Sequence, residues 1–136
     1  MINKYLQTGA LLLSLVLVLS ACTSRKEEIS LNTKGFLDAY FKVDYKAASS
    51  FCTKELGEEL VNSLKSLDNL EPAVRVMLEK QSKEAKTEII SVNSERGKDT
   101  ATVLYKVILP NFPQGIENTL SLVKMDKKWW VVALGK

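Results

Sequence analysis

Residues 100–109 read TATVLYKVIL, and their hydrophobic pattern indicates the class of fold. Its apolar side chains occupy every second position, namely Ala101, Val103, Tyr105, Val107 and Leu109. This period of two is typical of a β-strand with one buried face. The charged segment 96–99 contains a glycine and predicts a turn, so we expect an earlier strand at Glu88–Val92 to pair with this one.

Two further strands are predicted after residue 109. The segment 110–115, PNFPQG, contains two prolines and a glycine and is expected to be a loop. A strand at 116–125 follows, with Leu120 and Leu122 on one face, and a charged turn then leads into a last strand at 129–134. The last strand is expected to alternate between Trp129, Val131 and Ala133 on one face and Trp130, Val132 and Leu134 on the other. Short turns between consecutive strands indicate an antiparallel meander.

The chain before this sheet has the period of helices. Residues 36–41, FLDAYF, space their apolar side chains for one face of a helix, and Asn32 or Thr33 is expected to cap its start. Asp44 is placed to cap a short second helix at 45–51.

Two more helices are expected before the first strand. Thr53 is placed to cap the third, whose apolar stripe consists of Leu56, Leu60, Val61 and Leu64. The fourth begins at Pro72 and fades through the charged stretch 79–86. Helices followed by an antiparallel sheet predict an α+β fold.

The N-terminus, MINKYLQTGALLLSLVLVLSAC, has the features of a secretory signal peptide. Lys4 supplies a positive charge, residues 10–19 are apolar, and small residues precede Cys22. The sequence Leu19-Ser20-Ala21-Cys22 resembles a bacterial lipobox, in which the cysteine thiol is diacylated and the chain is cut before it. We therefore expect a signal peptide at 1–21 and a lipid anchor at Cys22.

An uncleaved transmembrane anchor is the alternative, because residues 5–24 carry no charge over a length that can nominally span a bilayer. Both interpretations attach the rest of the chain to a membrane of the bacterial cell envelope, and we expect the outer membrane rather than the inner one. Residues 22–31 are expected to be the lipidated cysteine and a flexible tether, and residues 32–136 the globular domain. Lys26-Glu27-Glu28 in the tether resembles signals that send some lipoproteins to the cell surface, with a solvated linker as the competing interpretation.

Composition excludes several classes of function. The 136 residues include 19 basic and 16 acidic side chains, a formal charge of +3, which gives no electrostatic case for nucleic acid. The chain has no histidine, which removes catalytic triads, imidazole bases and histidine zinc sites. We assign no catalytic, cofactor-binding or metal-binding residue. With Cys22 acylated, Cys52 has no disulfide partner and is expected to be a small buried thiol.

Two stretches carry a resemblance to a known family. Residues 36–41 followed by Asp44-Tyr45-Lys46-Ala47-Ala48 are similar to the opening of nuclear-transport-factor-two-like domains. The ending, Leu122 to Val132, resembles their last hairpin, where a tryptophan follows a charged turn. With the lipobox, the chain resembles short bacterial lipoproteins of unknown function that carry this cystatin-like fold. The resemblance implies N-terminal helices packed on a curved four-stranded antiparallel sheet that forms a cone with a pocket inside.

The same resemblance argues against a transferred activity. Phe36 stands where the steroid-isomerase branch has a tyrosine that donates a proton, and the dehydratase branches use histidines that this chain lacks. Tyr40, Tyr105 and Trp129 are expected to line the cone, and either Trp129 or Trp130 is expected to be partly exposed.

Three functions remain open at this point. The favoured one is a non-enzymatic envelope lipoprotein that binds a small apolar ligand or an envelope protein. The alternatives are a histidine-free lyase or isomerase that uses tyrosine and aspartate, and a structural or immunity-type lipoprotein with no pocket. An open apolar cavity favours the first, convergent polar side chains in a cavity favour the second, and a filled cone favours the third. The sequence leaves the ligand, the partner and the oligomeric state open.

Overall fold

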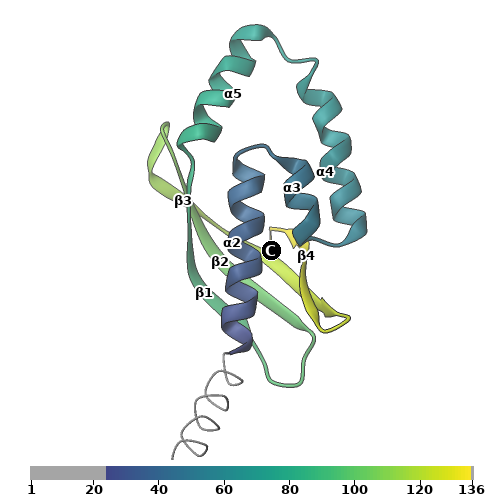
Figure 1. Ribbon diagram of the computed structural model, residues 1–136. Coiled ribbons are helices and arrows are strands. Elements are labelled where there is room, and N and C mark those ends of the chain that lie inside the picture. Colours follow the sequence, from purple (N-terminus) through teal and green to yellow (C-terminus); the bar gives the residue numbers. More distant parts are fainter. Residues whose placement is uncertain (1–23, 136) are drawn as a thin grey trace, which may run out of the picture.

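The computed structural model describes residues 24–135, which form an α+β fold (Figure 1). Helices occupy the N-terminal part: α2 (Arg25–Phe41), α3 (Tyr45–Ala48), the 3-10 turn η1 (Ser49–Phe51), α4 (Lys54–Leu67) and α5 (Pro72–Glu84). Strands follow: β1 (Lys86–Ser94), β2 (Thr100–Leu109), β3 (Phe112–Met125) and β4 (Lys128–Leu134). All three strand pairs are antiparallel and the strand order is β1-β2-β3-β4. The expected α+β fold, with helices packed on a curved four-stranded antiparallel meander, is confirmed.

Helix α2 runs along one face of the sheet, whereas α4 and α5 extend beyond one end of the sheet (Figure 1). We call α4, the connecting residues 68–71 and α5 the arch. The start of α2 and the β1–β2 and β3–β4 turns lie at the other end of the molecule (Figure 1). Within residues 24–135, no helix is both long and apolar enough to cross a membrane.

Helix α2 begins seven residues earlier than expected, at Arg25 instead of Asn32, so the prediction of a flexible tether is wrong for residues 25–31. The hydroxyl of Ser24 caps the helix by accepting a hydrogen bond from the Glu27 amide at 3.3 Å, and two glutamates in the first turn suit the helix dipole. Ile29 is fully buried and extends the apolar face by two turns. Residues 25–31 thus continue the helix with Ile29 buried in the core and Leu31 exposed.

The short second helix begins where expected. The Asp44 carboxylate caps α3 by accepting from the Ala47 amide at 3.2 Å, and η1 continues the turn to Phe51. Cys52 then forms a parallel bridge with Val131, and the Thr53 amide donates to the Val131 carbonyl at 2.9 Å. This segment therefore covers the β4 edge of the sheet before α4 starts.

The expected loop at 110–115 is wrong in extent, because only Pro110 and Asn111 form the turn and β3 starts at Phe112. Pro113 is tolerated in β3 because β4 pairs only with Leu120–Met125, so no strand needs the missing proline N–H. A register shift between Val107 and Leu109 and a positive φ of 84° at Gly115 absorb the extra residues on β3.

A second bulge corrects the expected faces of β4. Leu122 pairs with Val131 but Ser121 pairs with Ala133, so Val132 is the extra residue. Beyond it the alternation reverses: Ala133 is exposed, and Leu134 packs against the core. Trp129 and Val131, which precede the bulge, lie on the expected face and are buried.

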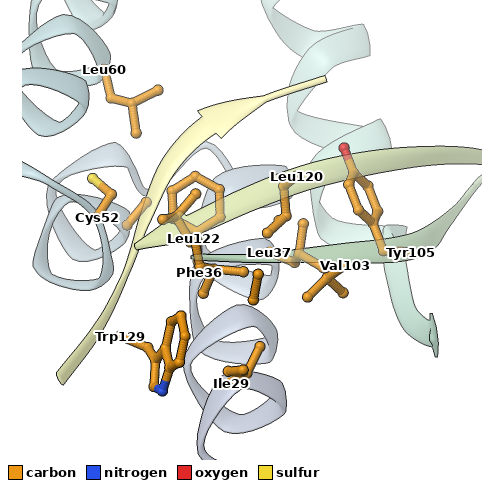
Figure 2. Close-up of a cluster of buried hydrophobic side chains, with 13 residues drawn as sticks. Ile29, Phe36, Leu37, Cys52, Leu60, Val103, Tyr105, Leu120, Leu122 and Trp129 are labelled. Carbon is orange, nitrogen blue, oxygen red and sulfur yellow. The ribbon is translucent and has the colours of Figure 1, made fainter. Parts of the chain in front are cut away.

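The space between α2 and the sheet is filled with side chains (Figure 2). From the helix come Ile29, Phe36 and Leu37, and from the strands Val103, Tyr105, Leu120, Leu122, Trp129 and Val131, all with at most 4% of their surface exposed. Tyr40 and Phe41 pack against this cluster. The face of α2 and the inward-facing strand residues therefore form one cluster.

Candidate functional site

The structure places the residues singled out from the sequence in different surroundings. Cys22 lies outside the described residues. Tyr105 and Trp129 are 3% and 4% exposed and belong to the core, and the Tyr105 hydroxyl points away from the apolar cluster (Figure 2). Trp129 also borders a groove near the start of α2. Trp130, which points to the opposite face of the sheet, is half-buried.

Tyr40 belongs to a group of aromatic rings at the C-terminal end of α2. Its ring stacks on Phe36 with a centroid distance of 5.6 Å and on Tyr45 at 5.4 Å, and meets Phe41 edge-on at 5.1 Å. Such ring pairs stabilise packing beyond the area that they bury. Burial, with a smaller effect from Tyr40, raises the pKa of Tyr45 and of Tyr105. A tyrosine with a raised pKa remains a neutral hydrogen-bond donor, and this arrangement suits a packing role.

Asp38 ties α2 to β1. The Lys34 ammonium lies 2.8 Å from the Asp38 carboxylate and also donates to the hydroxyl and the carbonyl of Thr87, and the Thr87 hydroxyl donates to Asp38. Partial burial raises the pKa of Asp38, but these hydrogen bonds and the positive charges of Lys34 and Lys42 outweigh burial and leave the pKa below its usual value. The carboxylate is therefore ionised and engaged in a structural contact.

Cys52 is buried with 3% of its surface exposed, and its thiol donates a weak hydrogen bond to the Ser49 carbonyl. Burial raises the pKa of the Cys52 thiol. Because the thiolate is the reactive form, this environment suits packing and not nucleophilic chemistry.

The arch carries more apolar side chains than are buried in the core. Among the described residues of α5 none is fully buried, and Val74, Val76 and Met77 are 46%, 67% and 60% exposed. On α4 only Gly57 and Leu60 are buried, although the helix is strongly amphipathic. The expected α4 stripe is therefore split: Leu60 reaches the core, whereas Leu64 faces the space below the arch.

That space is a cavity of about 530 Å³, which we call the arch groove. Its apolar lining consists of Val43, Leu64, Leu67, Leu70 and Leu78, contributed by the α2–α3 turn and by each part of the arch. Its polar lining consists of Lys42, Asp68, Arg75, Glu79 and Ser82. The volume lies within the range of small-molecule sites, and the lining combines five apolar with five polar side chains.

Arg75 holds the top of the arch in shape. Its guanidinium donates to the carbonyl of Asp68 at 2.7 Å and to that of Leu67 at 3.5 Å, at the end of α4 where carbonyls lack helical partners. The groove therefore has a fixed turn at one end. Its two cations, Lys42 and Arg75, are matched by the carboxylates of Asp68 and Glu79, so the lining carries no net charge.

Val43 enters the groove from a strained backbone position. The Asp44 amide donates to the Ala39 carbonyl at 2.9 Å and the Val43 amide to the Tyr40 carbonyl at 3.0 Å, which closes α2 with the motif that usually has glycine at the position of Val43. Val43 has a φ of 60°, which is costly for a β-branched residue. Strain of this kind is often found at functional sites, and here it places an apolar side chain in the groove.

A second groove, of about 500 Å³, lies at the opposite end of the molecule, between the first turns of α2, η1 and the β3–β4 turn. We call it the anchor-side groove; its lining includes Leu31, Phe51, Trp130, Lys127 and Lys128. Leu31 is 69% exposed although it lies on a helix that packs on the sheet.

Neither groove has the composition of a metal site, and residues 24–135 contain no group of three or more cysteine or carboxylate ligands that could hold a metal ion. No known family model matches the chain, and no curated protein matches it. Sequence reasoning missed the arch groove and Val43. The available signal was the surplus of apolar residues on the last two helices over what a four-stranded sheet can cover.

Proposed function

We propose that this protein is a non-enzymatic bacterial envelope lipoprotein, anchored to a membrane by lipid on Cys22, that binds a small apolar ligand in the arch groove. The observation that carries the binding half is the arch groove itself. It is lined by five apolar side chains, whereas the space between α2 and the sheet is filled. An apolar molecule that enters the groove removes its own surface and that of the lining from water.

The anchor half is supported by the lipobox-like sequence at the end of an apolar segment. The resemblance to lipoproteins with a nuclear-transport-factor-two-like domain is consistent with the α+β fold, and we retain it as part of the proposal. The cone that was expected to hold the ligand is filled, which by itself favours a structural lipoprotein. The arch groove, at the end of the helices and outside the curve of the sheet, is what supports ligand binding instead.

The charge balance of the groove narrows the ligand class. Asp68 and Glu79 oppose Lys42 and Arg75, and Arg75 is already engaged with backbone carbonyls. The lining therefore offers no unmatched charge to a strongly ionic ligand, and a neutral, mostly apolar molecule suits it best.

A fluorescent probe tests the binding half. N-phenyl-1-naphthylamine, a neutral apolar fluorophore, is titrated into the chain from Thr23 to Lys136, which contains the whole described core. We expect saturable fluorescence enhancement at one site, lost in Leu78→Glu and retained in Val76→Glu, because Val76 lies on the same helix but outside the groove. Equal enhancement in the two variants, or no saturable enhancement in the wild type, would contradict the proposal.

Metabolic labelling with a fatty acid tests the anchor half. Cys22→Ala is expected to abolish labelling and to leave the precursor uncleaved, whereas Cys52→Ala leaves both unchanged because Cys52 is buried in the domain. If labelling persists in Cys22→Ala, the proposed lipid anchor at Cys22 is wrong.

A further inference from the structure

The end of the domain opposite the arch gathers cationic and aromatic side chains around the start of α2. The Arg25 guanidinium donates to the carbonyls of Glu95 and Lys98 in the β1–β2 turn, and lies 5.5 Å from the centre of the Trp129 ring. These contacts join the first residue of the helix to the β1–β2 turn and to Trp129 near the start of β4. The start of α2, the β1–β2 turn and the start of β4 therefore form one surface at this end of the described residues.

The anchor-side groove opens on this surface. Leu31 is 69% exposed on α2, and Phe51 and the half-buried Trp130 line the same groove. Lys127, in the β3–β4 turn, and Lys128, at the start of β4, line it together with Glu28, and Asp126 precedes them, so two basic side chains stand beside two acidic ones. Apolar and aromatic side chains bordered by lysines form the combination that suits the zone between lipid tails and water.

Chain length places this surface close to the lipid that we propose on Cys22. Only Thr23 separates Cys22 from the helix cap Ser24, so the two Cα atoms are at most about 7 Å apart. Glu28 and Asn32, which line the groove, lie about 6 to 12 Å along the helix from Ser24. With α2 upright these residues would stand up to about 13 to 19 Å from Cys22, above a polar layer about 5 to 8 Å thick, so the groove reaches the headgroups when α2 is inclined toward the membrane.

We propose that the anchor-side groove rests on the phospholipid headgroups of the membrane that holds Cys22. Trp130 and Leu31 contact the interfacial layer, and Lys127 and Lys128 face the lipid phosphates. This inference deepens the proposed function and rests on lipidation of Cys22. It fixes the orientation of the domain, with the arch groove directed away from the membrane.

The two tryptophans of the chain allow a direct test with the lipidated protein that begins at Cys22, in vesicles of phosphatidylethanolamine and phosphatidylglycerol. Some of the lipid carries bromine on acyl carbons close to the headgroup, which quenches nearby tryptophan emission. Trp129 is 4% exposed but borders the same groove, so we expect the stronger quenching to arise from Trp130 and the total to fall markedly in Trp130→Phe. Bromine placed near the bilayer centre should quench much less.

Charge reversal supplies a matched pair of variants. Lys127→Glu with Lys128→Glu is expected to reduce the quenching, whereas Lys80→Glu with Lys83→Glu, at exposed positions of the arch, leaves it unchanged. If the protein does not incorporate into vesicles, the proposed lipid anchor at Cys22 is wrong, and the proposed orientation on the membrane is wrong with it. A protein that incorporates but whose Trp130 is not quenched, or whose Trp130 instead becomes buried in a self-associated form, would overturn the orientation alone.

Discussion

Trp129→Ala is the substitution that tests the packing of the whole domain. Trp129 joins α2, β4 and the β3–β4 turn, with 4% of its surface exposed and the Arg25 guanidinium over its ring at 5.5 Å. Truncation of a buried tryptophan to alanine costs about 3 to 5 kcal/mol, and loss of the cation–π contact adds about 0.5 to 1 kcal/mol.

Two features of the site reduce this cost. The indole Nε1 is buried and has no hydrogen-bond partner among the described residues, so its removal relieves a penalty of about 1 to 3 kcal/mol. The ring also borders the anchor-side groove, so water can enter the space that it leaves. We therefore expect Trp129→Ala to lower the free energy of unfolding by about 3 kcal/mol, a large part of the 5 to 15 kcal/mol of a typical domain.

Urea denaturation of the chain from Thr23 to Lys136, followed by far-ultraviolet circular dichroism, measures this change without relying on tryptophan emission. Trp130→Ala is the matched control, because the neighbouring ring is half-buried on the other face of the sheet and its loss is expected to cost about 1 kcal/mol. Equal stability of Trp129→Ala and the wild type, or a greater cost for Trp130→Ala, would refute the packing described here.

Three further substitutions test the backbone strain at Val43, the charge of Asp38 and the close contact between Gly35 and a neighbouring ring. Val43→Gly is expected to raise the free energy of unfolding by about 1 kcal/mol, because glycine adopts a φ of 60° without strain, while it weakens probe binding in the arch groove; a destabilised variant in urea would contradict this. The pKa of Asp38 is lowered in the folded protein, so the carboxylate stabilises the fold at a pH above its unfolded pKa. This contribution is lost as the pH falls through the lower folded pKa. In a plot of the urea midpoint against pH, Asp38→Asn should therefore show a smaller decrease at acid pH than the wild type. Gly35→Ala places a Cβ 2.7 Å from the Phe51 ring, so thermal unfolding should show a lower midpoint, whereas an unchanged midpoint would show that the ring can move aside.

The strand pattern could be predicted from the sequence because each buried face repeats with a period of two. The alternation of residues 100–109 identified β2 within its observed bounds. The prediction failed at Val132, because a bulge is a property of the pairing between two strands and not of either strand alone. The prediction also failed at Pro113, which was expected in a loop and lies in β3. A proline fits there because β4 does not extend along this part of β3, so no β4 residue needs a hydrogen bond from its backbone nitrogen.

The candidate site was harder to predict. Tyr40 and Tyr105 were expected to line a pocket, but aromatic residues on a core-facing helix and strand fill space as readily as they line it, and composition does not separate the two cases. Val43 had a weak signal: with one helix ending at Phe41 and Asp44 capping the next, only two residues remained for the turn, neither of them glycine. The arch depends on how far α5 stands from the sheet, and helix periodicity does not specify that distance.

The bridge between Cys52 and Val131 also constrains the order in which the chain can fold. The residues that follow the second helix complete their hydrogen bonds only with the last strand, and α2 packs against that same strand. Contacts between segments so distant in sequence incur their loop-closure entropy before they contribute stability, which slows folding. A chain synthesised N-terminus first therefore completes its core only once β4 has formed, and loss of Trp129–Leu134 would remove the part of the packing surface that β4 supplies to α2 and Cys52.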